Sequence, residues 1–250
     1  MSGHSKWHNI RLRKGKQDLQ RGKIFTKLAR EIIVAAKEGG GNADANLALR
    51  MAVQKARENS MPADNIKRAI QRGTGEIEGA NYDEITYEGY GTAGVAVMVQ
   101  CLTDNRNRTV AELRNIFSKN GGNLGEMGCV GWMFDQKVLV QISADKSDEE
   151  TVMMATMDAG AEDIKVEEDV IEVTCASDAL AKVRDALNEA GIEFISAELT
   201  MIPKTTVRVE DLKEAGRILR LMDALEDNDD VQNAYANFDI PDEILQEVAA

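Results

Sequence analysis

The pattern of the chain changes abruptly at Gly73-Thr74-Gly75, and this change constrains the fold more than any other feature. Before it, apolar residues recur at intervals of three and four, the period of an amphipathic helix. After it, short apolar runs typical of strands alternate with helical segments. The charge reverses at the same point: residues 1–74 carry 16 Lys/Arg and 6 Asp/Glu, whereas residues 75–250 carry 14 and 37. The contrast predicts separate modules, a cationic one suited to a polyanion and an acidic one repelled by it.

The first part of the chain predicts a small helical domain over residues 17–75. Its first helix is expected to end at Gly39-Gly40-Gly41, and its second to begin after Asn42 or Asp44 as N-cap. A third helix is expected from about Pro62 to Gly73, with glycine as the stop signal. Residues 1–16 show no apolar periodicity and are predicted to be a flexible basic arm.

The second part predicts two α+β domains, one inserted into the other. Residues 136–203 give the order βαββαβ, which is the ferredoxin-like arrangement. Residues 80–135 contain predicted strands near 84–90, 93–102 and 130–134 and one helix, but they lack the second helix and closing strand that residues 204–240 supply. We therefore predict an α+β domain formed by 80–135 together with 204–240, interrupted by the 136–203 domain. The predicted fold class is α+β with three domains, the N-terminal one made of three helices.

The composition of the chain argues against a membrane protein, a disulfide-rich protein and a secreted protein. With 43% apolar and 29% charged residues, the chain has the composition of a globular protein, and no apolar run approaches the ~20 residues of a membrane span. The three cysteines are odd in number and widely spaced, which excludes a fully paired disulfide framework or a CxxC metal site. Free cysteines fit a reducing compartment, so we expect a cytoplasmic protein. The basic N-terminus lacks the apolar core of a secretory signal.

The N-terminal thirty residues are the candidate binding site. They hold nine Lys/Arg and a single acid, Asp18, in a chain of net charge −13. Lysine and arginine neutralise phosphates, and a tryptophan can stack on bases. The predicted nucleic-acid-binding residues in this segment are His4, Lys6, Trp7, His8, Arg11, Arg13, Lys14, Lys16, Arg21, Lys23 and Lys27. The alternative is a solvated tail, which is the usual role of a charge run.

Arg106 and Arg108 complete the candidate set. They lie just before an expected helix, whose capping box would be Thr109 to Glu112, and a helix N-terminus attracts phosphate. The alternative, left open, is that Asp104 and nearby acids pair with these arginines and fix the loop. The acidic run Glu226–Asp230 is expected to be a solvated turn between a helix and a strand, with an acidic cleft as the alternative.

Enzymatic and metal sites are not predicted. His4 and His8 have the spacing of two ligands on a helix, but no third Cys or His lies near them. Gly89, Gly91 and Gly94 form a GxGxxG string, yet a strand is expected after it where a dinucleotide site requires a helix. No paired acid and base or nucleophile motif is present. We expect no catalytic residue, no bound metal and no cofactor.

Six stretches together resemble the YebC/PmpR family. They are GHSKW (3–7), RGKIFTKL (21–28), YEGYG (87–91), DNRNRT (104–109), SKNGGNLG (118–125) and EDNDDVQ (226–232). The resemblance covers nearly the whole chain. It implies a cytoplasmic three-domain protein in which a helical domain is followed by two α+β domains around a cleft. It also implies a probable DNA-binding transcriptional regulator, whereas some relatives resemble mitochondrial translational activators or ribosome-associated factors that relieve stalling.

These observations predict a non-enzymatic, nucleic-acid-binding regulator of gene expression. The partner is DNA or ribosomal RNA, with the ribosome itself as a further candidate. No membrane contact is expected, and the protein is expected to be a monomer or a weak dimer. One alternative is an RNA-associated translation factor that relieves stalled translation. A second is a regulatory module in which the inserted βαββαβ domain binds a small ligand.

Overall fold

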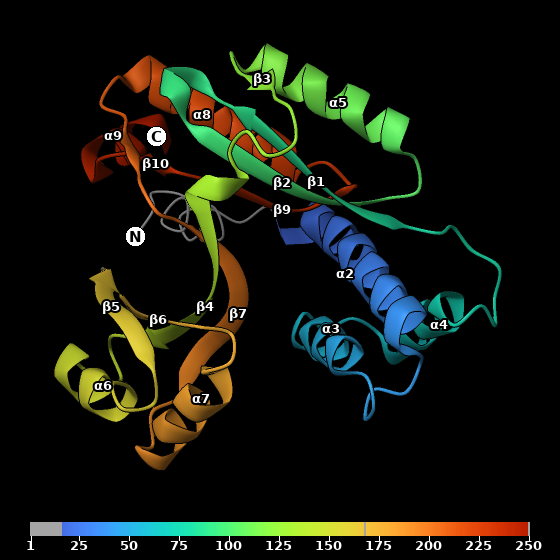
Figure 1. Cartoon of the computed structure of the whole chain (residues 1–250), viewed down its shortest axis with the longest axis horizontal. Coiled ribbons are helices and arrows are strands. Elements are labelled where there is room, and N and C mark those ends of the chain that lie inside the picture. Colours follow the sequence, from blue (N-terminus) through green and yellow to red (C-terminus); the bar gives the residue numbers. More distant parts are fainter. Residues whose placement is uncertain (1–16, 168, 250) are drawn as a thin grey trace. The chain divides into compact units, whose positions relative to one another are not determined.

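A computed structural model of the protein describes residues 17–167 and 169–249 (Figure 1). The chain divides into two compact units: Trp132–Thr206 forms one, and the described residues before and after this segment form the other. The α+β fold class is confirmed, since a group of three helices is followed by two antiparallel four-stranded sheets with their own helices. Within the described residues, no helix is long and apolar enough to cross a membrane.

The first three helices pack around one apolar core. They are α2 (Gln17–Gly39), α3 (Leu47–Glu58) and α4 (Ala63–Gly73). Ile32, Leu49 and Ala56 are completely buried in this core, with 0% of their surface exposed. The predicted N-cap at Asn42 or Asp44 is wrong, because Asn46 caps α3 by accepting a hydrogen bond from the Leu49 amide at 3.1 Å. The Nδ2 atom of Asn46 donates hydrogen bonds to the carbonyls of Ala35 and Gly40, at the end of α2. Asn46 therefore links the end of α2 to the start of α3.

The first sheet follows and has the strand order β3-β1-β2-β9. Its elements are β1 (Asp83–Tyr90), η1 (Thr92–Gly94), β2 (Ala96–Thr103), α5 (Arg106–Lys119), β3 (Asn123–Leu124), α8 (Leu212–Glu226) and β9 (Val231–Ala236). A short parallel pair, β8 (Val207–Arg208) with β10 (Phe238–Asp239), and a last helix, α9 (Asp242–Ala249), complete this unit. The α9 helix was not predicted.

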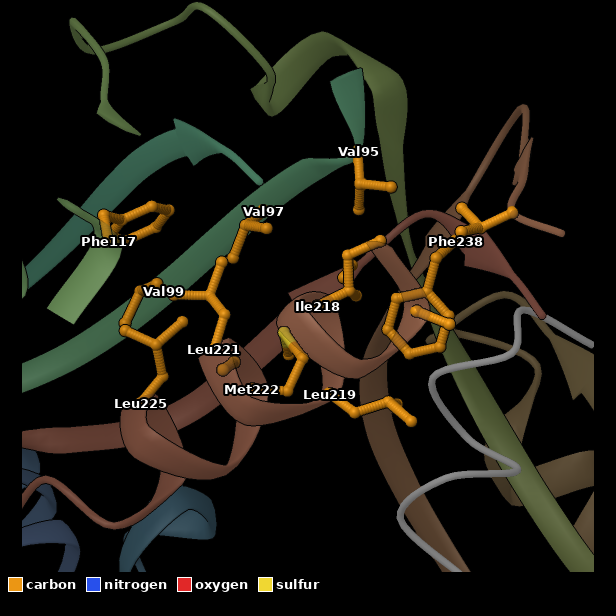
Figure 2. Close-up of a cluster of buried hydrophobic side chains, with 14 of the residues drawn as sticks. Val95, Val97, Val99, Phe117, Ile218, Leu219, Leu221, Met222, Leu225 and Phe238 are labelled. Carbon is orange, nitrogen blue, oxygen red and sulfur yellow. The ribbon is translucent and has the colours of Figure 1, made fainter. Parts of the chain in front are cut away.

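Helix α8 supplies much of the core beneath this sheet. Figure 2 shows the side chains of Val97 and Val99 from β2 directed toward the α8 residues Leu221 and Leu225. All four are 0% exposed. Burying a branched apolar side chain of this size contributes about 1.5–3 kcal/mol. The packing fixes the orientation of α8, so its opposite face points to solvent.

Three predicted boundaries before β4 (Phe134–Ser143) are wrong. Strand β2 begins at Ala96 and not at 93, because Ala93 has a left-handed φ of 57° inside a 3₁₀ turn. Helix α5 begins one turn before the expected capping box, because Asn105 accepts a hydrogen bond from the Arg108 amide at 3.0 Å. The strand expected over 130–134 is replaced by the 3₁₀ turn η2 (Gly131–Met133).

The second unit contains the βαββαβ segment. Its elements are β4 (Phe134–Ser143), α6 (Glu149–Thr156), β5 (Ala161–Glu167), β6 (Val170–Cys175), α7 (Leu180–Glu189) and β7 (Phe194–Pro203). The antiparallel strand order β5-β6-β4-β7 is the ferredoxin-like one. One sheet face packs against α6 and α7 through residues such as Val140, Val173 and Leu187. Cys175 is a buried free thiol in this core, where it packs as a small apolar side chain.

Candidate nucleic-acid interface

Most of the predicted binding residues precede the part of the chain that the structure describes. His4, Lys6, Trp7, His8, Arg11, Arg13, Lys14 and Lys16 lie outside the described residues, as do the predicted arm 1–16 and the histidine pair considered as metal ligands. Arg21 belongs to α2, but its side chain is outside the description. The structure describes the side chains of four predicted residues: Lys23, Lys27, Arg106 and Arg108. Three of them, Lys23, Lys27 and Arg108, contact the segment 226–230 at the end of α8.

Two α2 lysines bind the C-terminal end of α8. Lys23 Nζ donates to the Asp227 carbonyl at 3.1 Å, and Lys27 Nζ donates to the Glu226 carbonyl at 2.7 Å. The last carbonyls of a helix have no partner within the helix and form the negative end of its dipole. The two lysines therefore cap α8 from outside.

The carboxylate of Asp230 lies at the centre of a buried network and is 3% exposed. Arg30 Nη1 lies 2.8 Å from its Oδ1, and Arg108 Nη2 lies 3.0 Å and 2.8 Å from Oδ1 and Oδ2. Hydroxyls of Thr103 and Thr109 donate to Oδ2 at 3.2 Å and 2.7 Å. Burial opposes ionisation of Asp230, but the hydrogen bonds from Arg108 and Thr109 and the charge of Arg30 outweigh it and lower its pKa.

The two predicted loop arginines are paired with acids. Arg106 Nε lies 3.0 Å from Asp83 Oδ2, and Arg108 Nη2 also lies 2.9 Å from Asp104 Oδ1. Hydrogen bonds to Asp230 and Asp104 raise the pKa of Arg108. This is the arrangement expected if the acids fix the loop, and the side chains of Arg106 and Arg108 are still 65% and 41% exposed.

The acidic run after α8 is not a solvated turn throughout, which corrects the expectation for Glu226–Asp230. Asp230 is buried, and Arg30 also donates to the Asp229 carbonyl. A cavity of about 470 Å³ lies beside it, lined by Lys23, Arg30, Asp104, Arg108, Glu112, Asp227, Asn228, Asp229 and Asp230. Five carboxylates against three cations make this cavity unsuited to phosphate. Apart from Arg30 and Glu112, the residues that line this cavity come from three of the stretches that carry the family resemblance: 21–28, 104–109 and 226–232.

The helical domain exposes a second group of cations that sequence reasoning missed. Lys37, Arg50, Arg57, Lys67, Arg68 and Arg72 are exposed. Their side chains form no hydrogen bond or ion pair with residues 17–167 or 169–249. On α3, Arg50 and Arg57 are seven residues apart and share one face. The signal was available, because the apolar stripe of α3, formed by Leu49, Ala52, Val53 and Ala56, leaves positions 50 and 57 outside it, on its flank.

The exposed face of α3 combines these charges with apolar side chains. Leu47 is 61% exposed and Met51 is 46% exposed; Leu47 is three residues before Arg50 and four before Met51, so it neighbours both on the helix surface. Guanidinium groups bind phosphate oxygens through two parallel hydrogen bonds, and adjacent apolar surface can contact sugars or bases. The outer surface of the helical domain is therefore chemically suited to a nucleic acid.

Comparisons with known proteins give a consistent identification. A family model described as "TACO1/YebC protein N-terminal domain" matches residues 5–76, and one described as "TACO1/YebC second and third domain" matches residues 82–238. A "probable transcriptional regulatory protein" of Syntrophobacter fumaroxidans is 56% identical over 249 residues, covering 100% of both chains. One of Pelotomaculum thermopropionicum is 56% identical, covering 97% of this chain and 100% of its own.

The fold agrees with a solved structure as well. The crystal structure of a conserved hypothetical protein from Aquifex aeolicus superposes with a TM-score of 0.82 at 45% identity, covering 92% of this chain and 94% of that one. Both family models together span nearly all of the sequence, in the order expected from its motifs. The chain therefore belongs to the TACO1/YebC family.

Proposed function

We propose that this protein is a non-enzymatic, nucleic-acid-binding regulator of gene expression that acts in the cytoplasm. The observation that carries the proposal is the charge division: residues 1–74 hold 16 Lys/Arg against 6 Asp/Glu, while the whole chain has net charge −13. A cationic end on an acidic protein directs polyanions to that end and away from the remainder. The basic N-terminal segment and the outer surface of the helical domain bind phosphate groups.

The contacts of the described residues divide the cations by role. Lys23, Lys27 and Arg108 are held by carbonyls and carboxylates of the same chain, and we assign them to positioning the helical domain. Arg50 and Arg57 have no such partners among the described residues and are free to bind phosphate. Together with Lys6, Arg11, Arg13, Lys14 and Lys16, they form the proposed interface.

Two nucleic acids are candidates. The names of the relatives from Syntrophobacter and Pelotomaculum favour DNA and transcription. The acidic remainder, with 14 Lys/Arg against 37 Asp/Glu over residues 75–250, favours a compact contact at one end of the protein. Such a contact suits structured RNA, as in a ribosome, better than a long DNA track. We retain RNA and translation as the second candidate function.

Crosslinking in cells followed by sequencing of the bound nucleic acid tests the proposal. The full-length protein is compared with a variant in which Lys6, Arg11, Arg13, Lys14 and Lys16 are alanine, and with Arg50→Ala/Arg57→Ala. Lys182→Ala, an exposed cation in the second unit, is the matched control. We expect both test variants to lose recovered nucleic acid and the control to keep it. Promoter DNA supports transcriptional control, ribosomal RNA supports translation, and equal recovery from all four proteins contradicts the proposal.

A further inference from the structure

Helix α8 carries three cations on its solvent face, within the part of the chain that is otherwise acidic. Lys213, Arg217 and Arg220 follow the spacing i, i+4, i+7, so they lie along one side of the helix. All three are exposed, and their side chains form no hydrogen bond or ion pair with the residues that the structure describes. Like charges at this spacing repel each other, so an anion bound between them is favoured.

The same three side chains line a cavity of about 450 Å³ between α8 and α9, together with Leu212, Gly216, Glu247 and Val248. A volume of this order is within the usual range for a small-molecule site, roughly 300–1,000 Å³. Leu212 is 40% exposed and, with Val248, gives the cavity an apolar portion. Cationic and apolar surface side by side suit a molecule that carries phosphate on an organic body.

The floor of this cavity is shaped by Gly216. A Cβ atom at this position would lie 3.3 Å from Arg220 Nη1 and 3.9 Å from the Val248 Cγ1 atom. The absence of a side chain therefore lets the Arg220 guanidinium lie back over the helix, between α8 and α9. The rest of α8 is held rigidly, since Ile218 and Leu221 on its opposite face are at most 1% exposed.

We propose that the cavity between α8 and α9 is a phosphate-binding site, occupied by a nucleotide or by the phosphates of a polynucleotide strand. Arg217 and Arg220 bind phosphate oxygens through paired hydrogen bonds, and Lys213 adds a third positive charge. Glu247 faces the cavity without forming an ion pair to any of the three cations, so it limits the charge that the site accepts. The site uses none of the residues of the proposed N-terminal interface.

Isothermal titration of the full-length protein with pyrophosphate, with a mononucleoside triphosphate and with a short single-stranded RNA tests this proposal. Arg217→Ala/Arg220→Ala is expected to weaken pyrophosphate binding at least about tenfold, because both guanidinium groups lose their charged hydrogen bonds to the phosphate oxygens. Glu247→Gln is expected to tighten it about two- to fivefold by removing a like charge. The control is Arg114→Ala, an exposed cation on α5 of the same unit.

The N-terminal variant with Lys6, Arg11, Arg13, Lys14 and Lys16 changed to alanine separates this site from the proposed function. It is expected to bind pyrophosphate like the unmodified protein. Tighter binding of the triphosphate than of the RNA per phosphate assigns the site to a free nucleotide, and the reverse assigns it to a strand. Pyrophosphate binding that is undetectable at millimolar concentration, or that survives Arg217→Ala/Arg220→Ala unchanged, overturns the proposal.

Discussion

Arg30 and Asp230 are 200 residues apart in the chain, yet their side chains form a buried ion pair with 2.8 Å between Nη1 and Oδ1. Their side chains are 12% and 4% exposed. Arg30 belongs to the helical domain, and Asp230 precedes the closing strand of the first sheet. The pair therefore links the cationic domain to the acidic one within a single compact unit.

Removing the charge of Asp230 is expected to destabilise this unit. In Asp230→Asn, Arg30 and Arg108 stay in place without their carboxylate, and loss of one partner of a buried pair costs about 3–5 kcal/mol. The free energy of unfolding from urea titration should fall by that order. Asp229→Asn is the matched control, because Asp229 is exposed and contributes its backbone carbonyl to the network. A change equal to that of the control would show that the network is not stabilising.

The lowered pKa of Asp230 also predicts the pH dependence of stability. Its hydrogen bonds and cationic neighbours favour the ionised form in the folded state. The stability that it contributes is therefore complete above the ordinary aspartate pKa of about 3.9, and it is lost as the pH falls through the lower folded value. The difference in unfolding free energy between the unmodified protein and Asp230→Asn should shrink between about pH 5 and pH 3. A difference that stays constant over this interval would contradict the assignment.

Glu88 is predicted to hold the loop before the second unit. Its carboxylate is 6% exposed and accepts hydrogen bonds from the amides of Gly128 at 2.8 Å, Val130 at 2.6 Å and Gly131 at 2.7 Å. Burial raises the pKa of Glu88, but these three hydrogen bonds outweigh it and lower the value. Glutamine has one acceptor oxygen, so Glu88→Gln leaves at least one of the three amide donors unsatisfied, at about 1–3 kcal/mol each.

Hydrogen exchange provides the measurement for Glu88. In Glu88→Gln, at least one of the Gly128, Val130 and Gly131 amides should exchange about tenfold or more faster, while amides in the core of α8 keep their protection. Glu84→Gln is the control, because Glu84 is an exposed residue of the same strand. Unchanged exchange of all three loop amides would show that the carboxylate does not hold the loop.

Two glycines of the helical domain are expected to respond to alanine in opposite directions. A Cβ atom at Gly73 would lie 2.5 Å from the Ile33 carbonyl oxygen, whereas one at Gly22 would meet nothing within 4 Å. Gly73→Ala should lower the unfolding free energy by about 1–3 kcal/mol through overpacking. Gly22→Ala should raise it by up to about 1 kcal/mol, since alanine favours the helix. Thermal unfolding of the two variants in parallel tests both signs.

Sequence periodicity predicted the α+β class because the apolar spacing changes from helical to strand-like at Gly75 and each element has a buried face. Sequence periodicity predicted the first residues of the helices less accurately than the fold class. Side-chain caps determine these starts. Asn46 is selected over Asn42 and Asp44 by its contacts with the Ala35 and Gly40 carbonyls, whereas Asn105 caps through a local contact with the Arg108 amide. The burial of Asp230 was not predictable either, because its partners Arg30 and Thr103 come from distant segments.

The sequence predicted where positive charge is concentrated, but not which individual cations face outward. Density of Lys and Arg singled out the N-terminal segment, but density alone does not separate Lys27, which caps a helix, from Arg57, which faces outward. That distinction follows from helix packing. The cations of α8 escaped notice because they are interleaved with acids, although their spacing from Lys213 to Arg220 marks one helical face.

The salt dependence of nucleic-acid affinity tests the central claim most directly. If about six phosphates are neutralised, the affinity of the full-length protein for duplex DNA or single-stranded RNA should fall roughly 10³-fold between 50 and 200 mM salt. Changing Lys6, Arg11, Arg13, Lys14 and Lys16 to alanine should remove most of that slope, by about 0.7–0.9 per cation, and weaken binding at 50 mM salt. An affinity and a slope that are the same in the two proteins, for both nucleic acids, would contradict the account.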